Sequence, residues 1–205
     1  MNFRKSLVLI AFICMPSVYA QNHLGVQGGL ALSTTTSSKL QGCDFHYDLG
    51  GYLGGIYEMD LKNGWKLLPQ LNLSYDSTGG NSEQSVYAYY TKFAVSVPVE
   101  LGYSVPVSNH SRVMFSAGPY ARFDVFGRDK KNVYHGNEEV SRLTLGWWHA
   151  SMSDKLDYGL QGGASYVMGK MFLSAKMKYS LKSDSFLNAM GHSLIFTTGI
   201  GYYFK

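Results

Sequence analysis

Residues 89–103 read YYTKFAVSVPVELGY, and every second residue from Tyr89 to Tyr103 is aromatic, aliphatic or threonine. The residues between them include Lys92, Ser96 and Glu100. Successive side chains of a β-strand point to opposite faces, so this alternation predicts a strand with one apolar and one polar face. The two faces of such a strand must meet different surroundings.

Seven further segments show the same period of two. Their apolar rows run over residues 23–32, 45–59, 65–75, 113–125, 158–166, 171–179 and 194–204. None of the eight rows carries a charged residue, although 16% of the chain is charged. A Lys or Arg at mid-bilayer costs ~2–4 kcal/mol, so charge-free rows are typical of strands whose apolar face lies in lipid.

A soluble barrel with an apolar interior, such as a lipocalin, would show the same alternation. The ends of the rows favour the opposite arrangement, because Trp65 and Tyr75, or Tyr89 and Tyr103, would lie at the two membrane interfaces where aromatic residues gather. The row lengths also match the ~9–11 tilted residues that cross a bilayer. We therefore expect an all-β fold, an eight-stranded antiparallel transmembrane β-barrel of the outer membrane.

The connections between the rows alternate in length. Long ones span residues 33–44, 76–88, 127–156 and 182–192, and short ones span residues 60–64, 104–111 and 167–170. Outer-membrane barrels have long outer loops and short periplasmic turns. This order therefore places the first strand's start and the last strand's end in the periplasm. Asn63-Gly64 is typical of a tight hairpin turn. Pro69, Pro98 and Pro119 fall inside rows, and we expect β-bulges there because proline cannot donate to the ladder.

The first twenty residues have the features of an export signal. A positive start at Arg4 and Lys5 is followed by an apolar stretch too short to span a bilayer and by a small-residue cleavage site ending at Ala20. We therefore expect a signal peptide over residues 1–20 and a single outer-membrane barrel domain over residues 21–205.

The cysteine content limits how the fold can be stabilised, and the net charge limits which partners we expect. Cys14 lies in the predicted leader, where a lipoprotein signal is the alternative, and Cys43 is the single cysteine that remains. One thiol cannot close an internal disulfide, so packing and ladder hydrogen bonds must supply the stability. Loss of Arg4 and Lys5 with the leader lowers the net charge from +4 to +2. Nucleic-acid-binding proteins concentrate positive charge, so we expect no nucleic-acid partner.

Short motifs occur in a fixed order along the rows. They are Gly25-Val26-Gln27-Gly28-Gly29-Leu30, Leu68-Pro69-Gln70-Leu71, Leu73-Ser74-Tyr75, Val97-Pro98-Val99-Glu100-Leu101-Gly102-Tyr103, Ala117-Gly118-Pro119-Tyr120 and Gly199-Ile200-Gly201-Tyr202-Tyr203-Phe204. With these motifs, residues 23–204 resemble the PorT-like outer-membrane β-barrel proteins. The resemblance implies an outer-membrane barrel without a catalytic set of residues shared by the family. It also implies that the prolines are family features. Some members of the family are associated with protein secretion. The chain departs from the family by Lys205, one residue beyond the terminal aromatic that is part of the usual assembly signal.

Pairing the rows across the short turns predicts a charge belt in the lumen. Glu58 falls opposite Lys66, and the next strand brings Glu100 near both Lys66 and Arg112. The interior of an eight-stranded barrel is only wide enough for side chains, so opposite charges on neighbouring strands must offset each other's burial. We expect this belt to be structural, with a gate or a proton relay as the alternative. A second group is expected higher in the lumen: Lys92, Arg122 and Asp124.

Catalytic and metal-binding signals are weak. The pairs that could carry chemistry are His149 with Ser151, His192 with Ser193, and His46 with Asp48. A His–Ser pair is the basis of the enzyme alternative, a lipid-modifying hydrolase or acyltransferase, but neither pair has a clear carboxylate to orient its histidine. A single His and Asp on one strand face do not complete a metal site. We therefore expect no enzymatic activity, no metal and no cofactor.

The longest predicted outer loop, residues 127–156, contains Trp147 and Trp148. Exposed aromatics on a long loop are typical of contact with a partner or a glycan, whereas an extended aromatic girdle or an early strand start is the alternative. We expect a non-enzymatic scaffold or loop-mediated binding component of the cell envelope, linked to protein secretion. Its partners would be outer-membrane lipid and envelope or secretion proteins. A small-solute channel is a further alternative.

Overall fold

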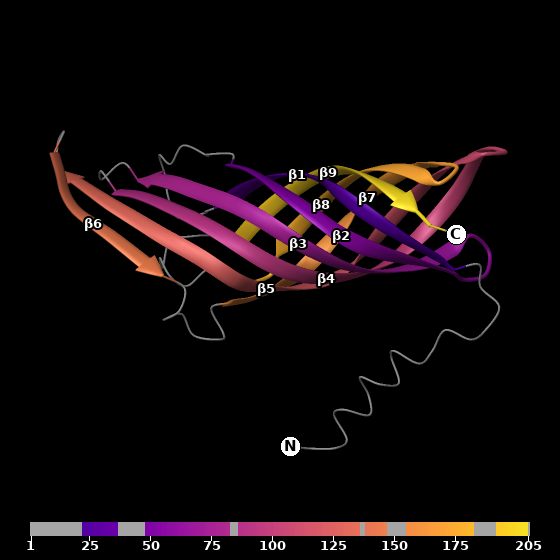
Figure 1. Ribbon diagram of the computed structural model, residues 1–205, viewed down its shortest axis with the longest axis horizontal. Coiled ribbons are helices and arrows are strands. Elements are labelled where there is room, and N and C mark those ends of the chain that lie inside the picture. Colours follow the sequence, from indigo (N-terminus) through magenta and orange to yellow (C-terminus); the bar gives the residue numbers. More distant parts are fainter. Residues whose placement is uncertain are drawn as a thin grey trace, which may run out of the picture.

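The computed structural model describes residues 22–36, 48–82, 86–135, 138–146, 155–182 and 192–204. Strands occupy almost all of them (Figure 1). They are β1 (His23–Thr36), β2 (Asp48–Asp60), β3 (Trp65–Ser82), β4 (Val86–Ser108), β5 (Ser111–His135), β6 (Glu138–Gly146), β7 (Leu156–Met168), β8 (Met171–Ser180) and β9 (His192–Tyr203). Within these residues, no helix has the length and apolar character needed to cross a membrane. The predicted signal peptide, residues 1–20, lies outside the described residues.

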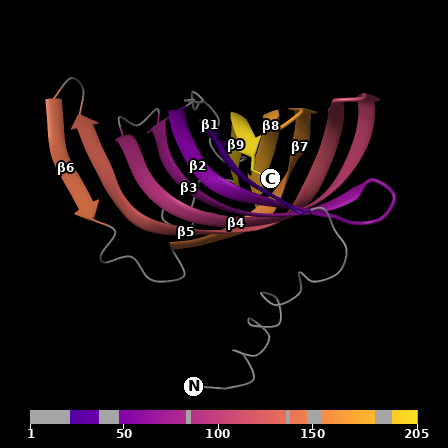
Figure 2. The same ribbon diagram turned by 45° about the vertical axis from the view of Figure 1, so that its right-hand side comes forward.

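Eight of the strands close into one antiparallel barrel. Neighbouring strands pair from β1 to β5, β5 pairs with β7, and the ring continues through β8 and β9. The ladder between β1 and β9, in which Leu30 lies opposite Thr198, closes the ring (Figure 2). The predicted eight-stranded antiparallel barrel is therefore confirmed.

The ninth strand, β6, lies outside the ring and pairs with β5. Beyond the barrel, the ends of β3, β4 and β5 form a sheet with the whole of β6, and this sheet projects past the other strands (Figure 1). We call this sheet the outer extension; it consists of residues 77–82 of β3, 86–91 of β4, 128–135 of β5 and 138–146 of β6.

The prediction of loops over residues 76–88 and 127–156 is wrong in part, because strands of the outer extension occupy much of both ranges. The described residues of the first, 76–82 and 86–88, are all strand, and the second contains the end of β5 and all of β6. Strands were expected to end where the apolar rows end. Above the bilayer both faces of a sheet meet water, so a strand continues there without an apolar face.

Apolar side chains cover the outside of the barrel. Leu53 and Leu71, on rows predicted to face lipid, are 65% and 56% exposed, whereas Glu58 and Glu100 are fully buried inside. A soluble barrel would bury its apolar rows and expose its charges, so this distribution excludes the lipocalin-like alternative.

One end of the barrel carries the tight turns. Asn63 and Gly64 adopt positive φ angles of 60° and 81°, which confirms the predicted hairpin turn, and Gly169 does so in the turn between β7 and β8. The start of β1 and the end of β9 lie at this same end, since Gly25 is opposite Tyr203. Short turns mark the periplasmic end, and the outer extension lies at the opposite end.

The bulges predicted at the prolines are absent from the described ladders. Residues on both sides of Pro69, Pro98 and Pro119 keep one register: Ile56 with Gln70 and Met59 with Leu67, Val97 with Ala121 and Leu101 with Ala117, and Ala121 with Tyr158 and Ala117 with Gly162. The register shifts between β4 and β5 fall at Phe93/Ala94 and Pro106/Ser108 instead. A missing proline N–H removes one ladder bond, and the flanking pairs hold the register without an added residue.

Candidate functional site

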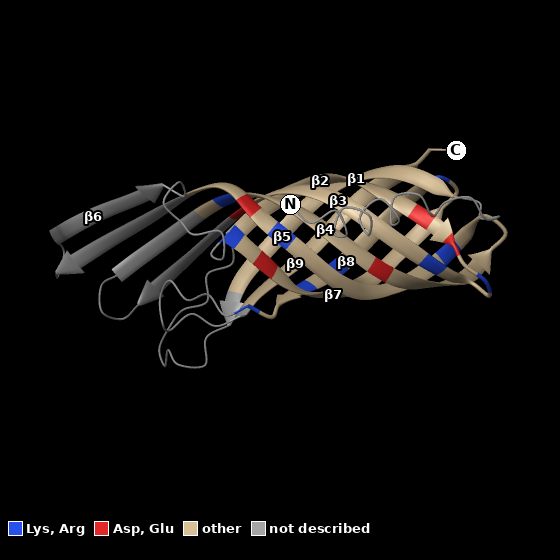
Figure 3. Ribbon diagram, turned by 90° about the horizontal axis from the view of Figure 1, so that it is seen from below, with Lys and Arg blue, Asp and Glu red and all other residues tan. Residues whose placement is uncertain are grey.

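Polar and charged side chains fill the interior of the barrel. Figure 3 shows acidic and basic positions interspersed along its described strands. An eight-stranded barrel has room inside only for its own side chains, so the chemistry of the lumen is set by these residues. The charges form three clusters, one near the periplasmic end, one in the middle and one near the outer end.

The periplasmic cluster is centred on Glu58. Nη2 of Arg112 donates to both oxygens of the Glu58 carboxylate, at 2.7 and 2.9 Å. Nζ of Lys66 lies 2.9 Å from Oε1 of Glu58 and also donates to Asp60. Two cations therefore offset the desolvation of one fully buried carboxylate. The structure thus brings together Glu58, Lys66 and Arg112 of the predicted belt.

Glu100, the fourth member of that belt, belongs to a separate middle cluster. Both of its oxygens lie 3.0 Å from Nζ of Lys176, Ser116 donates to it at 2.5 Å, and Gln161 donates to it as well. The register explains the difference from the prediction: Glu100 is opposite Leu68, one lumenal position further from the periplasm than Lys66. Lys176 comes from β8, which is not a neighbour of β4, so pairing adjacent strands could not find it.

The outer cluster is centred on Arg122. Its Nη1 lies 2.5 Å from Oδ2 of Asp76, and its Nε donates to Oδ1 of Asp124 at 2.9 Å. Nζ of Lys92 lies 3.4 Å from Asp124. The predicted group of Lys92, Arg122 and Asp124 is therefore assembled. Asp76 joins this cluster although the end of the apolar row at Tyr75 predicts a loop there, because β3 continues beyond that row.

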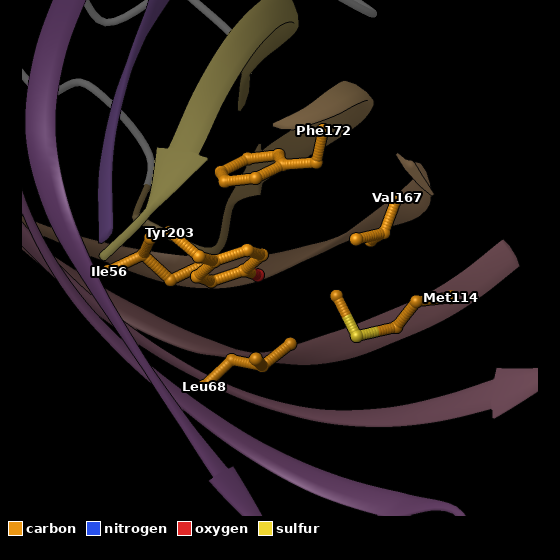
Figure 4. Close-up of a cluster of buried hydrophobic side chains, with 6 residues drawn as sticks. All are labelled: Ile56, Leu68, Met114, Val167, Phe172 and Tyr203. Atoms are coloured by element: carbon orange, nitrogen blue, oxygen red, sulfur yellow. The ribbon is translucent and has the colours of Figure 1, made fainter. Parts of the chain in front are cut away.

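An apolar layer lies between the periplasmic and middle clusters (Figure 4). It consists of Ile56, Leu68, Met114, Val167, Phe172 and Tyr203. Glu58, Lys66 and Arg112 belong to the periplasmic cluster. One lumenal position further from the periplasm on the same strands lie Ile56, Leu68 and Met114 of this layer. The rings of Phe172 and Tyr203 are 4.8 Å apart, and a side chain at Gly201 would collide with the ring of Phe172. The glycine therefore makes room for the aromatic residue that fills the lumen here.

Hydrogen bonds outside the three charged clusters occupy more of the interior. Nε2 of Gln27 donates to Oε1 of Gln70 at 2.8 Å and to Oδ1 of Asn72 at 2.9 Å. Near the outer end, the hydroxyl of Ser180 donates to Asp157 at 2.5 Å. These polar side chains are thus engaged with one another and, with the charged clusters and the apolar layer, occupy the lumen.

The weaker sequence candidates are not assembled into a site by the described residues. His46, His149, Ser151, Trp147 and Trp148 lie outside them. His192 and Asp48 begin strands β9 and β2, and Ser193 is half-buried. No group of three His, Cys, Asp or Glu residues suited to holding a metal ion occurs in the described part of the chain.

Comparisons with known proteins place the chain in a family. Residues 19–185 match the family described as outer membrane protein beta-barrel domain. No match was found among curated proteins.

Similar solved structures include the Ail attachment invasion locus protein of Yersinia pestis, at 13% identity and a TM-score of 0.48, covering 89% of this chain and 99% of that chain. OprG of Pseudomonas aeruginosa is 12% identical, with a TM-score of 0.47, covering 91% and 97%. Neisserial surface protein A is 14% identical, with a TM-score of 0.45, covering 88% and 97%. On the match over residues 19–185, the chain belongs to the outer membrane protein beta-barrel domain family, and its place is the outer membrane.

Proposed function

We propose that this outer-membrane barrel is a non-enzymatic scaffold that binds partner proteins of the cell envelope through its outer loops and outer extension. The observation that carries the proposal is the packed lumen. Paired charges and the apolar layer occupy the interior, so the surfaces left for function are those outside the barrel.

The apolar layer also argues against the alternative of a small-solute channel. A solute passing through the lumen would have to displace Leu68, Met114 and Phe172, which pack at the same level of the barrel (Figure 4). Eight-stranded barrels hold side chains in their interior, whereas water-filled channels need more strands. The lumen therefore supports a structural role for the buried charges.

The outer extension has the geometry of a binding element. It is a regular sheet that stands beyond the barrel, and within the described strands β6 is the last one in the pairing order. The outward edge of such a strand offers backbone N–H and C=O groups that an extended segment of a partner can pair with. A rigid barrel beneath it holds that edge in place.

The resemblance to PorT-like proteins suggests which partners to seek. Because some relatives are associated with protein secretion, we propose that the partners belong to an export or envelope-assembly system. The motifs of residues 97–103 and 199–204 support this assignment.

The test is removal of the hairpin that ends the outer extension. Arg128 and Gly146 lie opposite each other, so an Asn-Gly turn can join them in place of residues 129–145 while β5 keeps its pairing with β7. Proximity labelling in the native envelope should then lose the partner proteins seen with the unaltered chain. Lys66→Met, which leaves the extension intact, is the control and should keep them. An unchanged partner set in the hairpin deletion would contradict the proposal.

The enzyme alternative has its own measurement. A lipid-modifying hydrolase or acyltransferase would alter lipid A, so mass spectra of lipid A from cells with and without the gene would differ. We expect identical spectra. A difference that His149→Ala abolishes would replace the scaffold proposal with an enzymatic one.

A further inference from the structure

Two methionines flank the tight turn between β7 and β8 at the periplasmic end of the barrel. Met168 ends β7, Met171 begins β8, and the register places them opposite each other. They are 60% and 47% exposed, whereas Val167 and Phe172 beside them are buried in the apolar layer, so both methionines point away from the lumen. Opposite residues of an antiparallel pair have Cβ atoms about 4.5–5.5 Å apart, so these flexible side chains can bring their two sulfur atoms side by side.

A histidine of the neighbouring hairpin lies against the same turn. The backbone N–H of Gly169 donates to the carbonyl oxygen of His110 at 2.9 Å, and Ser111, the next residue, is opposite Met168. Figure 1 shows the hairpin of β4 and β5 beside the turn of β7 and β8, at the end of the barrel opposite the outer extension. The side chain of His110 is exposed. Two thioethers and one imidazole therefore project from backbone segments that are in direct contact.

The turn itself is open to the periplasm. Gly169 and Lys170 are exposed, and the charge of a lysine at the tip places that tip outside the hydrocarbon of the bilayer. Gly169 has a positive φ of 59°, and no described atom lies within 4 Å of the point where a Cβ on this glycine would stand. The described chain therefore leaves the approach to this turn uncovered.

The chemistry of these three side chains selects one kind of ion. Thioether sulfur is a soft ligand and favours Cu(I), whereas Zn²⁺ is bound by thiolate, imidazole and carboxylate groups. Neither a thioether nor a neutral imidazole brings a negative charge, so the set suits a monovalent ion better than a divalent one. The described His, Cys, Asp and Glu residues form no metal-binding group, and methionine ligands add a site for a soft ion only.

We propose that Met168, Met171 and His110 bind Cu(I) at the periplasmic end of the barrel. The ion is bound in the reduced form in which it arrives, so binding involves no electron transfer. An apolar contact with lipid would be made equally well by leucine, so replacing methionine by leucine separates metal binding from attachment to the membrane. The inference goes beyond the scaffold proposal, because that proposal concerns protein partners at the outer end of the barrel.

The test uses the full chain folded in detergent micelles, with Cys14 and Cys43 replaced by serine because a thiol binds Cu(I) by itself. Cu(I) is titrated without oxygen against a coloured Cu(I) chelator, whose absorbance reports the affinity of the protein. Met168→Leu and Met171→Leu should each weaken binding at least about tenfold, since even groups that only orient a metal ligand are worth about 10–100-fold. His110→Asn should weaken binding by a similar factor.

Met177→Leu is the matched control. Met177 is 46% exposed on β8, as Met171 is, but it lies opposite Gly162 and Phe196, so neither residue across the ladder supplies a sulfur or an imidazole. This variant should bind Cu(I) as tightly as the cysteine-free parent chain. Equal losses for Met171→Leu and Met177→Leu would overturn the proposal, and so would displacement of Cu(I) by an equal amount of Zn²⁺.

A second probe, Ag(I), reports on the sulfur atoms directly, because it has the same closed d shell as Cu(I) and is stable in air. In the parent chain with isotope-labelled methionine methyl groups, the NMR signals of Met168 and Met171 should move on titration with Ag(I), and the signal of Met177 should not. The leucine variants identify each signal, and heat-dependent migration on a gel checks that each variant is folded. Met168→Ile replaces Met168→Leu if the latter does not fold. Unmoved signals of Met168 and Met171 would overturn the proposal.

Discussion

Strands β3, β4 and β5 contribute to both the lumen and the outer extension, but the surroundings that select their residues differ between the two regions. Inside the barrel, Glu58, Glu100 and Arg122 each have oppositely charged partners within 3.0 Å. Beyond the barrel, the same strands continue as a sheet past the ends of their apolar rows. The difference follows from the surroundings, because a charge buried in the lumen needs a partner, whereas water above the bilayer places no such demand on a sheet.

The largest expected effect is in the middle cluster. Glu100→Leu should lower the free energy of unfolding by about 4 kcal/mol, because Lys176 is left buried without its carboxylate. The double variant Glu100→Leu with Lys176→Met should recover most of this loss, since it removes both charges together. Urea titration of the folded barrel in phospholipid vesicles measures both. A double variant as unstable as the single one would break the distinction between paired and unpaired charge in the lumen.

The second-largest expected loss of stability is in the apolar layer. Leu68→Ala should destabilise the barrel by about 3 kcal/mol, because Leu68 is fully buried among Met114, Phe172 and their neighbours and the cavity would not refill. It should also raise ion conductance across planar bilayers, since the layer closes the lumen. Leu71→Ala on the lipid-facing side of β3 is the matched control, because lipid can fill the space it leaves. Equal losses for the two variants would mean that Leu68 is not packed as described.

Lys66→Met tests the periplasmic cluster with a smaller expected loss. Glu58 keeps Arg112 as a partner in this variant, so the cost is the loss of the ionic contacts of Lys66 alone. We expect the free energy of unfolding to decrease by about 2 kcal/mol, which is in the range of hydrogen bonds to charged groups. The midpoint of thermal unfolding in detergent measures it, and an unchanged midpoint would remove Lys66 from the account of stability.

The bilayer explains which parts of the fold could be predicted from the sequence. Where a strand crosses lipid, its outward residues must be apolar, so the rows that contain Tyr75 and Phe93 were evident and the outward exposure of these two residues is confirmed. Above the bilayer this constraint ends, and residues 138–146 have no comparable row. That is why β6 was assigned to a loop.

The candidate site was predicted only as far as adjacent strands determine it. Glu58 and Lys66 flank one short turn, so their proximity follows from the hairpin. The pairing of Glu100 with Lys176 joins β4 to β8 across the lumen, and it depends on the tilt and stagger of the closed barrel. A sequence pattern with a period of two contains no information about that stagger, and Asp76 was missed because its strand outlasts its apolar row.

The smallest expected effect comes from the outer extension. Lys131→Gln should change the free energy of unfolding by less than about 0.5 kcal/mol, because Lys131 belongs to a sheet that stands beyond the barrel, and substitutions away from buried networks cost little. Lys66→Met removes the same kind of charge from the lumen, so urea titration of the two variants side by side compares the regions directly. If Lys131→Gln cost as much as Lys66→Met, position 131 would be as sensitive to the loss of a charge as the lumen is. The charges of the extension would then be structural, and the contrast between the two regions would fail.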